Sequence, residues 1–148
     1  FEMSGIMHRY CCPMARTVVV GDHPEKIDKA AKAISKALDE AISIIKPGIM
    51  AEEVDRACRR VIKEYGFADN FLHRTGYTMG IGFPPDWGEH VASFMEGDKT
   101  VLKPNMTFHM IPILFFKEFS VVLSESIRVT EDGCEVFHGG FERKLFTK

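Results

Sequence analysis

The feature that most constrains this fold is a pair of helical apolar stripes in the first half of the chain. Between residues 24 and 46, apolar residues recur every three or four positions, as on one face of an amphipathic helix. Pro47-Gly48 ends this stretch, and a second stripe of the same kind runs over residues 51–65. We therefore predict two consecutive helices that each bury one face.

Strand-like segments lie on both sides of the helices. Residues 1–21 alternate in polarity and predict a hairpin, with Gly5 as a turn or bulge. Residues 75–138 predict a run of strands, which includes two strands joined by a short turn at Lys117-Glu118 and a loop over residues 83–90. Residues 139–148 are expected to form a tail. This order predicts a single α+β domain, in which two amphipathic helices cover one face of a mostly antiparallel sheet.

Charge and cysteine content exclude several classes of protein. The 19 Lys and Arg residues against 21 Asp and Glu residues provide no concentrated positive field for a nucleic-acid partner. The longest apolar run, residues 111–116, is far shorter than the ~20 residues that span a bilayer, so no membrane partner is expected. The cysteines lack a CxxC pair and are interpreted as reduced, buried thiols of a cytoplasmic protein; they are Cys11, Cys12, Cys58 and Cys134.

Five short motifs follow one another along the chain. They are Arg16-Thr17-Val18 at the end of a strand, Ile45-Lys46-Pro47-Gly48, HRTGYTMG at residues 73–80, Leu102-Lys103-Pro104-Asn105-Met106, and VTEDG at residues 129–133. Together they resemble motifs of the pita-bread hydrolases, which include methionine and X-Pro aminopeptidases, prolidases, creatinase and ectoine hydrolase. Further features resemble the ectoine hydrolase branch: Tyr77 where peptidases have His, and residues 84–89, 108–112 and 143–146.

The resemblance implies a partial pita-bread fold. It also allows this sequence to be compared with the metal-ligand positions of the family's peptidases. Peptidases of this family hold two divalent ions with two Asp, one His and two Glu. An ungapped match places Glu2, Pro13, Tyr77, Ile111 and Ser124 at these positions, and a one-residue slip would bring Glu125 to the last. Proline and isoleucine offer no side-chain ligand, whereas hard cations need several oxygens. We therefore expect no metal and no cofactor, as the resemblance implies for creatinase and ectoine hydrolase.

Without metal ions, histidine and carboxyl groups must transfer the protons. His109 lies two residues before Ile111, so the two side chains share one face of a strand. Glu125 on the next predicted strand is expected to orient His109 or to act as a base, and Tyr77 to donate a hydrogen bond to a developing oxyanion. The alternatives are a hydrogen-bonded core histidine, a solvated glutamate and a tyrosine that only fills space.

Five residues are candidates for binding the substrate. Trp87 offers a flat face on which a cationic ring could stack, and Asp86 and Glu89 add negative charge beside it. His73 and Glu2 complete the set, since Glu2 takes the position of a family ligand. The alternatives are a rigid surface turn with a buried Trp87, a structural His73 and a frayed chain start at Glu2.

The expected function is hydrolysis of a C–N bond in a small cyclic amidine or in a guanidino or amide compound. The alternatives are an X-Pro dipeptidase or aminopeptidase and a catalytically silent binding module. The resemblance covers the tail of the first half and the whole second half of the family's domain, so the chain is expected to be a C-terminal fragment, inactive alone. The uncovered sheet surface predicts a homodimer or larger self-association.

Overall fold

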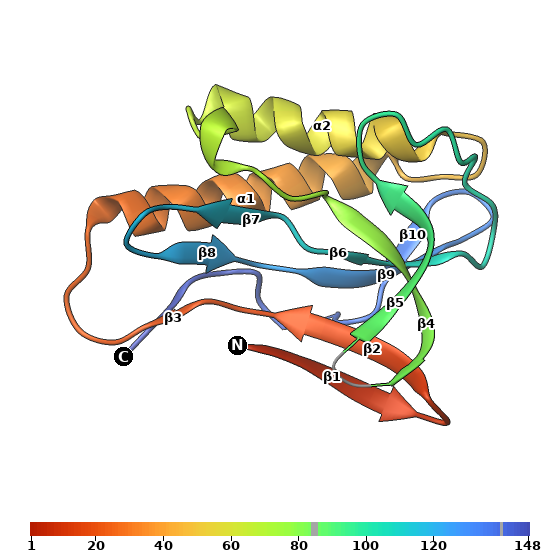
Figure 1. Ribbon diagram of the computed structural model, residues 1–148, viewed down its shortest axis with the longest axis horizontal. Helices are drawn as coiled ribbons and strands as arrows, with labels where there is room; N and C mark the ends of the chain where they lie inside the picture. The colour runs from red at the N-terminus through yellow and green to blue at the C-terminus, as the bar shows by residue number, and fades with distance from the viewer. Residues whose placement is uncertain (84–85, 140) are drawn as a thin grey trace.

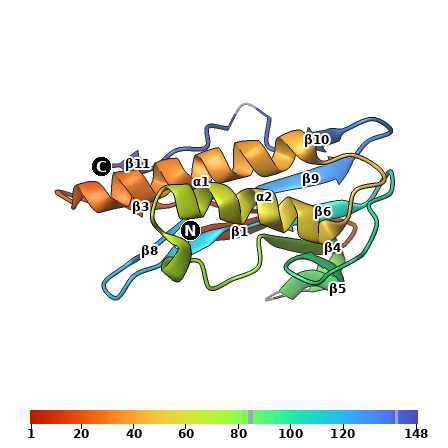
Figure 2. The same cartoon turned by 90° about the horizontal axis from the view of Figure 1, so that it is seen from above.

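The computed structural model describes residues 1–83, 86–139 and 141–148. Helices α1 (Glu25–Ile44) and α2 (Ala51–Glu64) form one layer, and a curled, mostly antiparallel sheet forms the other (Figure 1). Figure 2, which looks onto the helix layer, shows α1 and α2 side by side across the strands. The predicted α+β fold is confirmed, and the predicted helix bounds agree with the structure to within two residues.

The main sheet has the strand order β1-β2-β4-β6-β9-β10, and β5 pairs with β4. These strands are β1 (Glu2–Met7), β2 (Tyr10–Ala15), β4 (Gly76–Phe83), β5 (Asp86–Phe94), β6 (Thr107–Met110), β9 (Glu125–Val129) and β10 (Cys134–Val136). Two small pairs accompany it: β7 (Ile113–Phe115) with β8 (Ser120–Val122), and β3 (Val18–Val19) in parallel with β11 (Phe146–Thr147). A 3-10 turn, η1 (Ala68–Asn70), follows α2.

Three details differ from the sequence expectations. The first hairpin turns at His8 and Arg9, whose φ values are 50° and 70°, while Gly5 lies within β1 opposite Cys12. Most of the predicted loop at residues 83–90 belongs to β4 and β5 instead, with Pro84 and Pro85 outside the described residues. The predicted tail contributes β11, which pairs with β3 through long-range contacts that no local pattern encodes.

The two long strands predicted around Lys117-Glu118 are each divided. The first becomes β6 and β7 because Pro112 between them has no N–H to donate to a sheet ladder. The second becomes β8 and β9, and the turn at Lys117-Glu118 joins β7 to β8. The division leaves β6 and β9 as a short, well-paired centre of the sheet.

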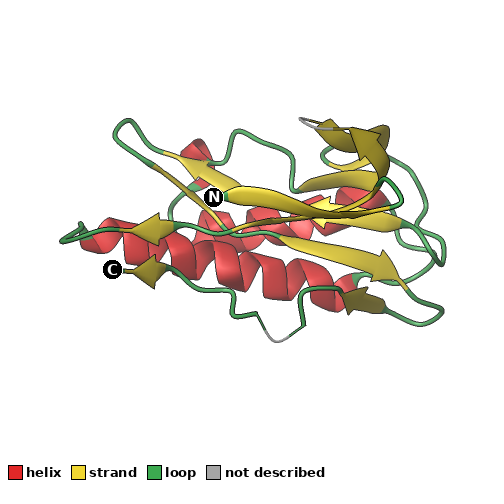
Figure 3. Ribbon diagram, turned by 90° about the horizontal axis from the view of Figure 1, so that it is seen from below, coloured by secondary structure: helices red, strands yellow, loops and turns green. Residues whose placement is uncertain are grey.

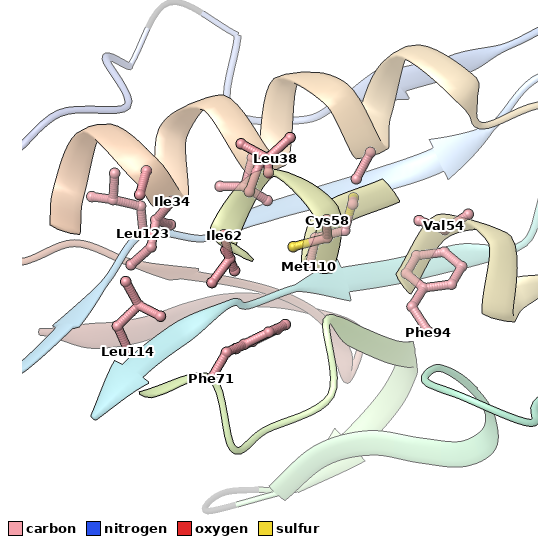
Figure 4. Close-up of a cluster of buried hydrophobic side chains, with 14 of the residues drawn as sticks. Ile34, Leu38, Val54, Cys58, Ile62, Phe71, Phe94, Met110, Leu114 and Leu123 are labelled. Atoms are coloured by element: carbon pink, nitrogen blue, oxygen red, sulfur yellow. The ribbon is translucent and has the colours of Figure 1, made fainter. Parts of the chain in front are cut away.

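The hydrophobic core fills the space between the helices and the sheet. Ile34 and Leu38 of α1 meet Ile62 of α2, and Met110 and Leu123 rise from the sheet below (Figure 4). All four cysteines are free, as expected; two are buried and two are only partly buried, namely Cys12 and Cys134. Neither α1 nor α2 is long and apolar enough to cross a membrane.

Candidate active site

The pairing of β4, β6 and β9 decides which side chains share a face of the sheet. Directly paired residues in antiparallel strands point to the same side, and successive residues alternate. Met110 packs in the core beneath the helices, and its partner Glu125 therefore points toward that layer. Tyr77 and His109, also paired, point to the opposite face, which Figure 3 shows in front of the helices.

In the described part of the chain, no helix covers this side of the sheet, which we call the open face. On it, a series of hydrogen bonds joins Trp87, Tyr77, His109 and Ser124. The Trp87 Nε1–H donates to Tyr77 Oη at 3.1 Å, and Tyr77 Oη lies 2.9 Å from His109 Nδ1. The His109 Nε2 lies 2.8 Å from Ser124 Oγ, which also accepts the backbone N–H of Ala15 at 2.6 Å. Side chains of β4, β5 and β6 and of Ser124, which directly precedes β9, therefore form one polar line, which we call the Trp–Tyr–His–Ser series.

His109 occupies the centre of this series and is fully buried, with 0% of its surface exposed. Burial, together with the charges of the nearby His138 and His73, lowers its pKa to about 3. Both ring nitrogens already have partners, so the imidazole is neutral near pH 7 and has no free edge. His109 can therefore act on a substrate only through Tyr77 or Ser124.

Tyr77 is the member of the series that combines a partly exposed ring with a reactive O–H group. Burial raises its pKa, the hydrogen bond from Trp87 lowers it, and the charge of Glu2 raises it again. The Arg74 guanidinium carbon lies 4.5 Å from the centroid of the Tyr77 ring. The His109 ring packs edge-on against the same tyrosine ring. The phenol therefore stays protonated near neutral pH and can serve as a hydrogen-bond donor.

The carboxyl group of Glu2 lies beside His109 of the series. It pairs with Ala15 across β1 and β2, and its Oε1 lies 4.0 Å from His109 Nδ1. Its side chain is 40% exposed, and partial burial raises its pKa. Glu2 is therefore both accessible and more easily protonated than an ordinary glutamate.

The structure does not bring Glu125 to His109. Its Oε1 accepts a hydrogen bond from Arg16 Nη2 at 2.8 Å, and its Oε2 lies 3.2 Å from His138 Nδ1. Arg143 Nε lies 3.5 Å from the same carboxylate. The expectation that Glu125 faces the cavity of His109 is corrected, because one residue of register separates Ser124, on the open face, from Glu125.

The other predicted binding residues lie around β4 and β5. Asp86 and Glu89 are both exposed, and Asp86 Oδ2 lies 2.9 Å from His90 Nε2. That hydrogen bond and the Gly88 N–H lower the pKa of Asp86. The carboxylate of Glu89 lies against Gly80. The structure thus brings Asp86 and Trp87 close to Tyr77, whereas the Glu89 side chain lies against β4 at Gly80.

His73 has a local structural role. Its Nδ1–H donates to the Arg74 carbonyl at 2.9 Å, and its own carbonyl accepts a hydrogen bond from Arg59. These contacts correspond to the structural alternative that the sequence left open. The sequence did not point to Arg74, which lies over the Tyr77 ring, and it offered Ser124 only as a residue at a ligand position; the place of Arg74 directly after His73 was the available signal.

The sequence profile of metallopeptidase family M24 matches residues 1–131. The chain belongs to this family. It is 38% identical over 148 residues to ectoine hydrolase of Halomonas elongata, covering 100% of this chain and 37% of that protein. It is 29% identical over 135 residues to Xaa-Pro dipeptidase of Pyrococcus furiosus, covering 90% of this chain and 37% of that protein.

Solved structures of M24 proteins have the same fold. Prolidase from Thermococcus sibiricus matches with a TM-score of 0.88 and 28% identity, covering 99% of this chain and 39% of that one. Dipeptidase PepE from Mycobacterium ulcerans matches with a TM-score of 0.88 and 24% identity, covering 99% and 38%. The expected partial pita-bread fold is confirmed, and this M24 chain spans less than two-fifths of the length of these relatives.

The family description implies metal ions, so the donor set of this M24 chain must be tested against them. Pro13 and Ile111 carry no donor atom, while Tyr77 and Ser124 are already hydrogen-bonded to His109. Within residues 1–83, 86–139 and 141–148, no group of three or more His, Cys, Asp or Glu side chains could hold a metal ion. The residues present do not fit a pair of divalent cations.

Proposed function

We propose that this chain carries the catalytic face of a metal-independent hydrolase, which cleaves a carbon–nitrogen bond in a small cyclic amidine, guanidino or amide compound. One observation carries the proposal: the Trp–Tyr–His–Ser series includes Tyr77 and Ser124 at positions where M24 peptidases are expected to have metal ligands. The 38% identity to ectoine hydrolase supports the same class of substrate.

Tyr77 stabilises charge in this proposal. The Trp87 N–H can only donate, so Tyr77 Oη accepts that hydrogen bond and keeps its own proton to give away. When His109 Nδ1 carries the ring proton, Tyr77 Oη accepts a second hydrogen bond from this N–H. The hydroxyl proton of Tyr77 is then free to point at a substrate. A donor held in place beforehand stabilises the negative charge that develops as water adds to the substrate.

Glu2 transfers protons in this proposal. As a water oxygen bonds to the amidine or amide carbon, the Glu2 carboxylate accepts one proton of that water. The protonated carboxyl then gives this proton to the departing nitrogen while the carbon–nitrogen bond breaks. The raised pKa of Glu2 suits it to both steps, and its 40% exposed side chain leaves room for a substrate.

His109 and Glu125 have different roles here from those that the sequence suggested. His109 positions Tyr77, since it is buried and both its nitrogens are engaged. Glu125 holds Arg16, His138 and Arg143 together on the helix side of the sheet, and so secures the C-terminal segment. The proposal therefore assigns direct contact with the substrate to Tyr77 and Glu2.

Hydrolysis by metal-free protein tests this proposal, with the protein at its full natural length and with ectoine and creatine as probes. We expect release of the ring-opened or amine product to survive exhaustive chelation. Replacing Tyr77→Phe should lower kcat about 100-fold, whereas Tyr10→Phe, at a tyrosine 61% exposed on β2, should have no effect. Activity only against X-Pro dipeptides, or binding without hydrolysis of any probe, would select one of the two alternative functions instead.

We also propose that copies of this chain associate through the edge formed by β1. This strand ends the main sheet, and its apolar side chains Met3, Ile6 and Met7 are exposed, as is Phe1 just before it. Unpaired strand edges with apolar side chains promote association. Sedimentation velocity is expected to show dimers or larger species at high concentration, and a single monomer of 16.8 kDa would contradict this.

A further inference from the structure

An arginine that the proposed mechanism does not use lies directly over Tyr77. Arg74 precedes β4, and its guanidinium carbon is 4.5 Å from the centroid of the Tyr77 ring. Its Nη1–H donates to Ser93 Oγ at 2.9 Å, and Ser93 faces Tyr77 across β4 and β5. Ring stacking and this hydrogen bond therefore fix the guanidinium at the edge of the site.

Among the described residues, no Asp or Glu oxygen lies within ion-pair distance of the Arg74 guanidinium. Six other arginines each lie within 4.0 Å of an Asp or Glu oxygen: Arg16, Arg56, Arg59, Arg60, Arg128 and Arg143. A partly buried guanidinium with one neutral partner retains several N–H donors, in the planar arrangement that suits a carboxylate.

We infer that Arg74 binds a carboxylate group of the substrate, an inference that rests on the proposed function and names its substrate class. Negatively charged side chains lie on the same face as Tyr77. Glu2 approaches His109, and Asp86 directly precedes Trp87, which donates a hydrogen bond to the Tyr77 hydroxyl. A cationic amidinium or guanidinium group suits these carboxylates. The substrate is therefore a small zwitterion, and Arg74 selects it over the same ring without a carboxylate.

The test compares two probes that differ only in the carboxylate: ectoine and its decarboxylated analogue. Dissociation constants are measured by titration calorimetry on the full-length protein, so that binding is read separately from hydrolysis. The Arg74→Met variant keeps an apolar stem over Tyr77 and should weaken ectoine binding about 10- to 100-fold. Its affinity for the analogue should change little, and Arg74→Lys should restore part of the loss for ectoine.

Arg128→Met is the matched control, because Arg128 is an exposed arginine on β9 that pairs with Glu135. It should leave the binding of both probes unchanged, and thermal unfolding of each variant confirms that it is folded. Equal losses for the two probes in Arg74→Met, no loss for either, or a wild-type protein that binds neither would overturn the inference. Selective loss of ectoine binding in a protein that hydrolyses neither probe would uphold Arg74 and reject the proposed hydrolase function.

Discussion

Lowering the pH from 7 to 5 is expected to reduce the free energy of unfolding by about 2 kcal/mol through His109 alone. Burial holds the pKa of His109 near 3 in the folded protein, whereas its ordinary value is 6.5. Between these values the unfolded chain binds a proton that the folded chain does not. This contribution to stability is therefore complete above about pH 7 and is lost as the pH falls through 6.5 toward 3.

Urea unfolding at the two pH values measures this loss, and the variant His109→Gln should remove that part of the pH dependence. His8→Gln is the control, because His8 is exposed in the turn between β1 and β2 and should leave the pH dependence intact. Direct titration of the imidazole by NMR needs no variant. A His109 ring that becomes protonated near pH 6.5 would contradict the buried, neutral state described here.

Replacing Arg16→Met should destabilise the protein by about 3–5 kcal/mol, because it leaves a buried charge without its partner. The Arg16 and Glu125 side chains are only 6% and 2% exposed, and they meet at 2.8 Å. Arg16 also donates to the Ala15 carbonyl and bridges to the segment near Phe141. Its loss therefore removes support from β2, β9 and the C-terminal segment together.

The exposed pair of Arg128 and Glu135 provides a matched control at the same distance, 2.8 Å. Arg128→Met should change the free energy of unfolding by less than about 1 kcal/mol, since solvent screens exposed ion pairs. Chemical denaturation of both variants at one pH makes the comparison. Adding Glu125→Gln to Arg16→Met should recover part of the loss, and equal small effects of the two arginine replacements would argue against a buried network.

The sequence predicted the parts of the fold that depend on local periodicity. The stripes of α1 and α2 placed both helices, because an apolar face repeats every three to four residues whatever it packs against. The alternation along β6 likewise placed His109 on the face opposite to that of its neighbours Phe108 and Met110. The motifs at residues 73–80 and 129–133 predicted the family, which the profile match confirms.

The rest of the site depended on register and on contacts between distant segments. A shift of one residue decides whether Ser124 or Glu125 faces His109, and only the pairing of β6 with β9 resolves it. The stacking of Arg74 on Tyr77 depends on the pairing of β4 with β5, which places Ser93 opposite Tyr77 and within hydrogen-bond distance of Arg74. The buried Arg16–Glu125 pair joins positions 109 residues apart, so no local sequence pattern locates it.

In the function proposed here, the Trp–Tyr–His–Ser series takes the place of a pair of metal ions in this M24 chain. Elemental analysis by plasma mass spectrometry of the full-length protein, purified without chelators and supplied with Mn²⁺, Co²⁺ and Zn²⁺, tests it most directly. We expect no stoichiometric divalent metal and unchanged hydrolysis of the probe after chelation. Two tightly held ions per chain, whose removal abolishes hydrolysis and whose return restores it, would show that this chain is a metal-dependent enzyme.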